Sequence, residues 1–290
     1  MMKIGVIVDM LRMPLKDGIR TAAEIGCEGI QIYGADAEKE FNLLERTAAE
    51  ARALNKYIRD CGLVMASISS DMPGHGFCRA AEVPERVKNV NHVVDMALEF
   101  DCHIITNHIG VVPSDPADPE YAVLVDSLGQ VASYAASKGS FIAIETGPEP
   151  ARILKRLLGD VNSPALAINM DPANLAMVQN EDAEEAVNTL AGHIVHTHAK
   201  DGVHLQDCNA KEVYDAFADG GFEALLAKTG KLFEEVPLGQ GQVRWDAYLA
   251  ALKRTGFDGF LTIEREVGGN PKADIAMAVE FLKEKLKALK

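Results

Sequence analysis

Four segments of the chain each place a metal-ligand type of residue at the end of an apolar, β-rich run. They are FIAIETG with Glu145, ALAINMD with Asp171, HIVHTHAKD with His198 and GFLTIERE with Glu264. Side chains alternate along a strand, so residues two apart share a face. If the four side chains point inward from neighbouring strands, two glutamates, an aspartate and a histidine meet at one point. We expect them to bind one divalent cation.

The ligand types indicate which ion such a site would hold. Three carboxylates and one imidazole form an oxygen-rich shell. This shell favours Mn²⁺, with Mg²⁺, Co²⁺ or Zn²⁺ as alternatives, over a thiolate zinc site. An ion with open positions can polarise a carbonyl group and make the neighbouring C–H bond more acidic, and a nearby carboxylate can take that proton. The chemistry suits a small polyhydroxylated substrate.

The rest of the chain predicts the elements that position these residues. Four further apolar runs precede the four segments, at residues 3–9, 28–34, 64–70 and 103–110. Stretches with helical period, such as LLERTAAEARALNKYIRDCG, lie between the runs. Strand and helix repeated eight times predict the α/β class and a single (β/α)₈ TIM barrel domain over residues 1–290. An open doubly wound sheet is the alternative, but VDMLRMP rather than G-x-G-x-x-G follows the first run.

One long segment interrupts the repeat. It runs from residue 202 to residue 244, between the seventh and eighth expected strands. Because it follows a strand, it belongs to the C-terminal face of the barrel, where active sites of this fold are built. We expect an extended loop there that is functional or locally structured.

Composition narrows the classes of partner and compartment. The formal net charge of −14 argues against a general nucleic-acid binder, because an acidic surface repels phosphate backbones. No apolar run is long enough for a membrane span, and the N-terminal MMKIGVIVDM does not read as a signal peptide. Five cysteines without a C-x-x-C pair are typical of a reducing compartment. We therefore expect a cytoplasmic protein.

Five motifs carry a resemblance to a known family. IETGPEP, NMDPANL, HTHAKD, PLGQGQV and GFLTIERE resemble the xylose isomerase-like TIM-barrel superfamily, and more closely its sugar phosphate isomerase/epimerase branch. The resemblance spans essentially the whole chain. It implies that Glu145, Asp171, His198 and Glu264 hold the metal ion. It also implies that Glu145 and Glu264 are the catalytic acid/base pair, and that the protein forms a homo-oligomer, either a dimer or a tetramer.

Four other residues are candidates for substrate binding: His108, Asn174, Lys200 and His204. His108 could hydrogen-bond the substrate or act as a general acid, with a structural role as the alternative. Lys200 could neutralise an oxyanion or a phosphate, or it could pair with Asp201 or another carboxylate. The epimerases that the chain resembles have a histidine where Asn174 stands and an arginine where His204 stands. These two departures leave the exact reaction open.

Four functions are compatible with these patterns. The first is a metal-dependent isomerase or epimerase that moves a proton next to a carbonyl through an enediolate. The second is a lyase that dehydrates a keto-cyclitol or a dehydroshikimate-like acid by the same first step. The third is an AP endonuclease-like enzyme, which the absence of histidine in SISS, Asn174 and the net charge of −14 disfavour. The fourth is a non-catalytic sugar-binding barrel with a structural metal.

Overall fold

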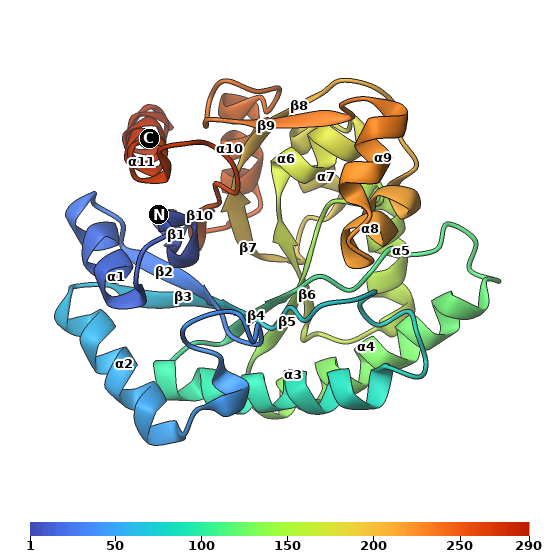
Figure 1. Cartoon of the computed structure of the whole chain (residues 1–290), viewed down its shortest axis with the longest axis horizontal. Helices are drawn as coiled ribbons and strands as arrows, with labels where there is room; N and C mark the ends of the chain where they lie inside the picture. The colour runs from blue at the N-terminus through green and yellow to red at the C-terminus, as the bar shows by residue number, and fades with distance from the viewer. Residues whose placement is uncertain (290) are drawn as a thin grey trace.

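Eight parallel strands close into a barrel with helices around it (Figure 1). The computed structural model describes residues 1–289 and has the strand order β1-β10-β7-β6-β5-β4-β3-β2 around the barrel. The barrel strands are β1 (Lys3–Ile7), β2 (Gly29–Tyr33), β3 (Val64–Ser69), β4 (Ile104–Asn107), β5 (Phe141–Glu145), β6 (Leu166–Met170), β7 (Ile194–Ala199) and β10 (Phe260–Ile263). The prediction of a (β/α)₈ TIM barrel is confirmed.

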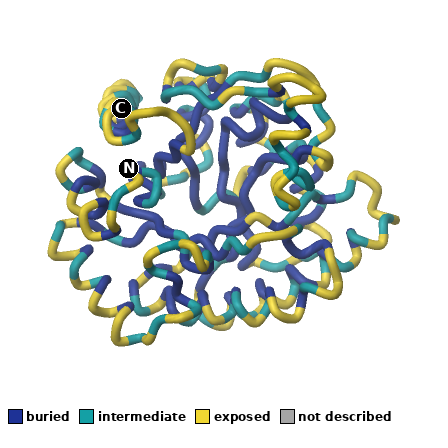
Figure 2. The backbone as a smooth tube through the Cα atoms, in the orientation of Figure 1, coloured by how far each residue is buried: buried dark blue, intermediate teal, exposed yellow. Residues whose placement is uncertain are grey.

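Helices follow the strands and cover the outside of the barrel. The outer helices are α1 (Leu15–Glu24), α2 (Ala48–Asp60), α3 (Val83–Ala97), α4 (Pro119–Ser137), α5 (Ala151–Val161), α7 (Ala183–Thr189), α10 (Trp245–Arg254) and α11 (Pro271–Ala288). Figure 2 shows buried strands inside and exposed residues along the outer sides of these helices. The start of α2 has a local cause, because Thr47 and Glu50 form a reciprocal capping box. Within residues 1–289, no helix has the length and apolar character needed to cross a bilayer.

Short helical turns connect several of these elements. After β6 the chain enters α6 (Pro172–Asn174) and then a π-helical turn, Leu175–Gln179. Asp171 begins this turn, since its side chain accepts hydrogen bonds from the backbone N–H groups of Ala173 and Asn174. Three 3₁₀ turns lie elsewhere, at Val8–Leu11, Leu43–Glu45 and Leu98–Phe100.

The barrel interior is polar rather than purely apolar. Gln31 of β2, Ser67 of β3 and His196 of β7 are all buried. Oε1 of Gln31 accepts a hydrogen bond from Ser67 at 2.7 Å and lies 3.2 Å from Nε2 of His196. Strands β2 and β7 are not neighbours around the barrel, so these contacts cross its centre. The ligand cluster described below therefore lies on a layer of hydrogen-bonded side chains.

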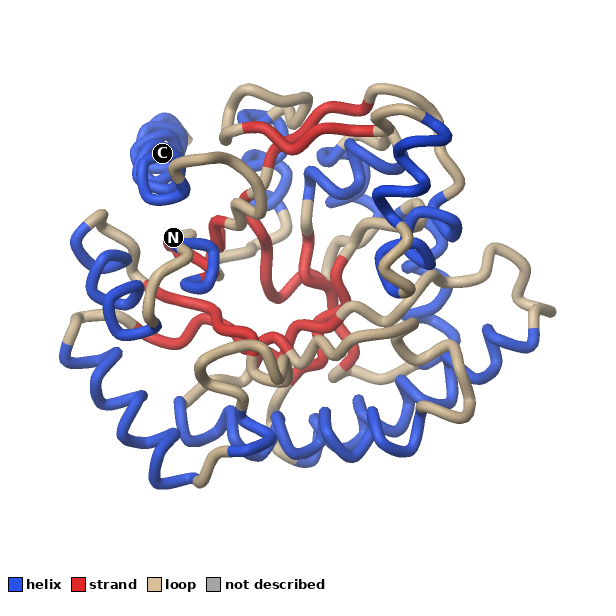
Figure 3. Tube along the Cα trace, in the orientation of Figure 1, coloured by secondary structure: helices blue, strands red, loops and turns tan. Residues whose placement is uncertain are grey.

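The long segment that the sequence predicts after β7 is present, and it is locally structured. Strands β8 (Asp201–His204) and β9 (Phe233–Val236) form an antiparallel pair, and α8 (Ala210–Ala218) and α9 (Phe222–Thr229) lie between them in the chain (Figure 3). Val213, Leu225 and Leu232 form a small apolar core of its own. We call residues 201–236 the insertion.

Candidate metal centre and active site

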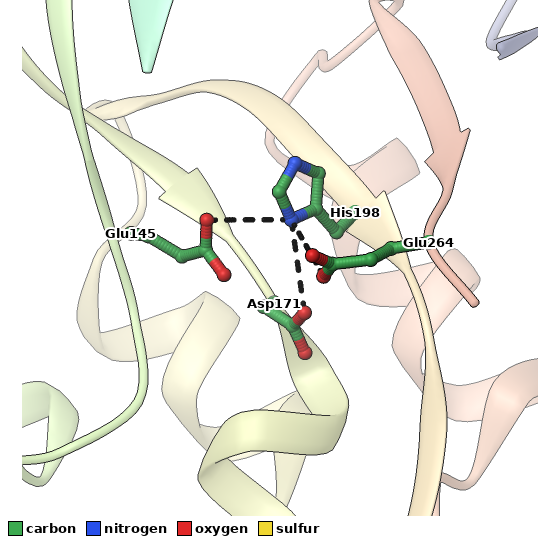
Figure 4. A group of neighbouring side chains, drawn as sticks. All are labelled: Glu145, Asp171, His198 and Glu264. Atoms are coloured by element: carbon green, nitrogen blue, oxygen red, sulfur yellow. Dashed lines mark ion pairs between the residues drawn. The ribbon is translucent and has the colours of Figure 1, made fainter. Parts of the chain in front are cut away.

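The four predicted ligands come together at one end of the barrel. Glu145 is the last residue of β5, Asp171 follows β6, His198 lies in β7 and Glu264 follows β10. These four strands are neighbours around the barrel. One ligand atom from each residue lies within 4.8 Å of the others, and all four residues are buried. Figure 4 shows the four side chains pointing toward one another, with Glu145 and Glu264 on opposite sides.

The arrangement of these atoms fits a divalent cation. Nδ1 of His198 lies 3.4 Å from a carboxylate oxygen of Glu145, 3.7 Å from one of Asp171 and 3.2 Å from one of Glu264. Nδ1 of His198 and Oδ2 of Asp171 are buried and have no hydrogen-bond partner. Buried polar atoms are normally paired, so unpaired atoms that face a common point indicate a missing ligand. Three carboxylates and an imidazole are donors that such a cation accepts.

Two amide side chains behind the cluster orient its ligands. Oε1 of Gln31 lies 3.2 Å from Nε2 of His198, and Nδ2 of Asn169 donates to Glu145 at 3.1 Å. A metal-binding histidine is usually held by such a partner on its second nitrogen. The sequence reasoning missed Gln31. The available signal was a polar residue inside the apolar run EGIQIYG.

Positive charges keep the two glutamates ionised. Burial opposes ionisation of Glu145, but the imidazoles of His108 and His198 outweigh it and hold its pKa well below the usual range. At Glu264, burial is likewise outweighed by Lys200 and His198, which lower the pKa to about 2. Both carboxylates are therefore charged at neutral pH and can accept a proton.

The pKa values of Asp171 and His198 are raised, whereas those of the two glutamates are lowered. Burial is the largest effect at Asp171 and raises its pKa to about 6, against the lowering effect of His198 and Lys200. Burial disfavours the charged form of His198, but the carboxylates around it raise its pKa well above the usual range. Without a cation, a proton on His198 balances the surrounding negative charge. A cation that binds here must displace that proton.

His108 and Asn174 both touch Glu145. Nδ2 of Asn174 donates to Oε1 of Glu145 at 3.0 Å, and Nε2 of His108 lies 3.4 Å from the same oxygen. The other ring nitrogen of His108 is 3.0 Å from Asp71, and its side chain is 45% exposed. Burial would lower the pKa of His108, but Glu145 and Asp71 raise it well above its usual value. His108 therefore links the buried Glu145 to the open cavity.

Lys200 and His204 lie in different surroundings. Nζ of Lys200 is 3.2 Å from Glu264 and also donates to Glu266, so its partners are carboxylates other than Asp201. His204 lies in β8, where its ring contacts the backbone oxygen of Met177 at 2.8 Å. Among the residues that the structure describes, His204 is not one that lines the cavity over the cluster. The structure thus places Lys200 at the site and turns His204 away from it.

A cavity of about 830 Å³ opens onto the cluster. Glu145, Glu264 and Lys200 line its inner end. Two tyrosines that the sequence reasoning missed also line it, Tyr33 at the end of β2 and Tyr214 on α8. A strand-end position could have indicated Tyr33, whereas Tyr214 comes from the insertion, whose fold the sequence did not reveal. The site can bind a polar molecule between two buried carboxylates.

Comparisons with known proteins agree with this fold. The sequence model of a family described as xylose isomerase-like TIM barrel matches residues 19–285. No curated protein matches the sequence significantly. Among solved structures, a xylose isomerase domain protein from Planctomyces limnophilus is 26% identical with a TM-score of 0.80, and the match covers 99% of this chain and 98% of that one.

Two solved structures with named activities have the same fold at lower identity. The probable 3-DHS dehydratase AsbF from Bacillus anthracis is 21% identical with a TM-score of 0.73, over 97% of this chain and 99% of that one. A D-psicose 3-epimerase from Clostridium cellulolyticum H10 is 14% identical with a TM-score of 0.74, over 98% of this chain and 99% of that one. At these identities the likeness shows the fold alone.

Proposed function

This chain belongs to the xylose isomerase-like TIM-barrel family, and on that premise we propose that it is a divalent-metal-dependent isomerase or epimerase. Its substrate would be a small polyhydroxylated molecule such as a sugar, a sugar phosphate or a cyclitol. One observation carries the proposal. Glu145 and Glu264 are buried, ionised carboxylates on opposite sides of a cation-binding cluster that opens into a cavity. We propose Mn²⁺ as the ion, because the shell is rich in carboxylate oxygens.

The chain's own residues can move a proton next to a carbonyl group. A bound divalent cation would supply Lewis acidity that makes the C–H bond beside the carbonyl more acidic. A substrate carbon held between Glu145 and Glu264 presents one face to each carboxylate. One carboxylate removes the proton from one face to give an enediolate, and the other, which must first take up a proton, delivers it to the opposite face and inverts the carbon. His108 touches Glu145 and is exposed to the cavity, so it can return a proton to that carboxylate.

Solvent exchange tests this proposal directly. The Mn²⁺-loaded protein is incubated in D₂O with a panel of ketoses and keto-cyclitols, and deuterium on carbon is measured by mass spectrometry. Glu145→Gln and Glu264→Gln should each lower the exchange rate by about 100-fold or more, since each removes a proton-transfer group. Glu284→Gln, an exposed change on α11, is the matched control. Undiminished exchange in both active-site variants would sink the mechanism.

A dehydratase is the second candidate, and the position of His108 favours it. A protonated imidazole beside Glu145, open to the cavity, can protonate a departing hydroxyl group after the first proton has been removed. The substrate would then be a keto-cyclitol or a dehydroshikimate-like acid. Loss of one water from the substrate, seen as a mass change, separates this outcome from isomerisation, which leaves the mass unchanged.

A further inference from the structure

The cavity over the cluster has two chemically different ends. We propose that the natural substrate has two matching parts, a polyhydroxylated part at the carboxylates and a planar apolar group against an aromatic wall on the insertion. An aromatic glycoside is the simplest molecule of this class. The inference rests on the proposed function, because the same cluster positions the polyhydroxylated part.

Three phenylalanines of the insertion form the aromatic wall. They are Phe217 of α8, Phe222 of α9 and Phe233 of β9, and all three line the same cavity as Glu145 and Glu264. The rings of Phe217 and Phe222 stack with centroids 3.9 Å apart and planes at 20°. Phe222 and Phe233 are 6.1 Å apart at 24°. The three rings thus form one stacked aromatic cluster that lines the cavity.

Tyr214 connects this wall to the carboxylate cluster. Its ring meets that of Phe217 edge-on, with centroids 6.4 Å apart and planes at 70°. Its hydroxyl oxygen lies only 2.6 Å from the point where a Cβ atom on Gly147 would stand. Gly147 follows Glu145 by two residues, so the absence of a side chain there lets Tyr214 approach the site. Tyr214 therefore lies between Gly147, which is next to the carboxylate cluster in the sequence, and the phenylalanines of the wall.

The size of the cavity and the exposure of the wall argue for a substrate larger than one sugar. Sites of roughly 300–1,000 Å³ hold drug-sized ligands, and this cavity, at about 830 Å³, lies in the upper part of that range. Phe217 is 51% exposed. A single sugar bound at the cluster would leave this apolar surface in water, which is unfavourable. A planar group joined to the sugar would cover it.

The position of the wall favours a small ligand over a second protein chain. The wall lines the cavity that contains the buried carboxylates, and charged side chains border it, namely Lys231, Glu234 and Glu266. An apolar surface with a few polar groups at one end is typical of small-molecule sites. A flat subunit interface would not need to be continuous with a cluster of buried carboxylates.

Paired glycosides test the proposal in the Mn²⁺-loaded protein. Dissociation constants of methyl β-D-glucopyranoside and phenyl β-D-glucopyranoside are measured by calorimetry, so that the two probes differ only in the apolar group. Burying a phenyl group on the wall should give the phenyl glycoside a roughly tenfold or greater advantage. Phe217→Ala and Phe222→Ala should each bring the ratio of the two dissociation constants, methyl over phenyl glycoside, close to one. Phe217→Leu should give an intermediate ratio.

Controls separate the wall from folding and from the proposed function. Met277→Ala removes a similarly exposed apolar side chain from α11. The ratio of the two dissociation constants in this variant should equal that of the wild type. Equal binding of the two glycosides, or an unchanged ratio in both phenylalanine variants, would overturn the proposal. So would a change from oligomer to monomer in Phe217→Ala without a change in the ratio, because the wall would then be a subunit contact. If the protein prefers the phenyl glycoside but catalyses no deuterium exchange, only the proposed function is contradicted. If it catalyses exchange but shows no preference for the phenyl glycoside, only the proposed role of the aromatic wall is contradicted.

Discussion

The amide oxygen of Gln31 lies 3.2 Å from Nε2 of His198. A carbonyl oxygen only accepts hydrogen bonds, so this contact favours a neutral imidazole with its proton on Nε2, against the amide nitrogen of Asn169, which lies at the same distance from that atom. Nδ1 then carries the free lone pair, and it is the nitrogen that faces Glu145, Asp171 and Glu264. Gln31 of β2 thus influences which ring nitrogen of His198, a candidate ligand on β7, carries the proton.

Replacing Gln31 should weaken metal binding without removing a ligand. In Gln31→Leu the imidazole of His198 loses the partner that fixes its tautomer and orientation. Loss of such a partner typically costs about 10–100-fold in metal affinity. Titration of the metal-free protein with Mn²⁺ by calorimetry measures the change. Gln130→Leu, the same substitution at an exposed position of α4, should leave the affinity unaltered.

Metal affinity should rise with pH. The cation needs Asp171 ionised and His198 neutral at Nδ1. The pKa of Asp171 is raised to about 6 and that of His198 is raised well above its usual value. Below pH 6 both groups hold protons that compete with the cation, and above pH 6 only His198 still does. Calorimetry in two buffers of different ionisation enthalpy counts the protons released. An affinity that stays constant between pH 5 and pH 8 would contradict this account of the cluster.

The buried Glu149 should make stability fall as pH rises. The residue is only 4% exposed, and neither carboxyl oxygen has a hydrogen-bond partner of good geometry. Burial raises its pKa from 4.5 to about 8, against weak opposition from the backbone of Val112 and the charge of His108. Between these two values the unfolded chain loses the proton while the folded chain keeps it, so the free energy of unfolding decreases.

Glu149→Gln removes that dependence. The variant should become more stable than the wild type as pH rises from 5 to 8, by roughly 2–4 kcal/mol at the upper end. Urea unfolding at several pH values gives the two curves. The control is Glu223→Gln on the exposed side of α9. Its free energy of unfolding should change with pH in parallel with that of the wild type. Parallel curves for Glu149→Gln as well would show that the carboxyl group has a partner in solution.

His75 should hold the insertion against the barrel. It lies in the loop after β3, and its two ring nitrogens are 3.1 Å from Asp215 and 3.0 Å from Asp219, both at α8 or its end. Hydrogen bonds to charged groups are stronger than neutral ones. In His75→Ala, amide hydrogens of residues 210–218 should exchange about tenfold faster, while those of the barrel strands keep their rates.

Mass spectrometry of hydrogen exchange resolves these segments. His103→Ala changes an exposed histidine that has no contact with the insertion, so it serves as the control. Equal acceleration in α8 and in the barrel strands would indicate general destabilisation and not the release of a local contact.

The sequence allowed the barrel and the meeting of the four candidate ligands to be predicted, because both depend on local patterns. The expected run at residues 141–147 corresponds to β5, which ends at Glu145, and the run at 64–70 corresponds to β3. Alternation along a strand then determines which side chains share a face. Four such residues with matching parity at the ends of neighbouring parallel strands lie close together at one end of the barrel.

The parts that could not be predicted depend on contacts between distant residues. Strands β8 and β9 pair Asp201 with Val236, and nothing in either short segment reveals its partner. The sequence therefore predicts only a long segment, functional or locally structured, over residues 202–244, and a substrate-binding role for His204. The hairpin instead turns His204 toward the backbone of Met177. Gln31 was missed for a related reason, because the register between β2 and β3 shifts at Ile30/Gln31 and only the assembled barrel shows where the side chain points.

The pairing of β1 with β10 joins the two ends of the chain, with Lys3 opposite Phe260 and Val6 opposite Ile263. Glu264 follows directly after this seam. The four candidate ligands themselves come from β5, β6, β7 and β10, which adjoin one another, whereas the seam beside them joins the most distant strands, whose contacts are slow to form. A cation bound at the cluster would hold the end of β10 in place, and it would thereby slow reopening of the barrel at the seam where the chain closes on itself.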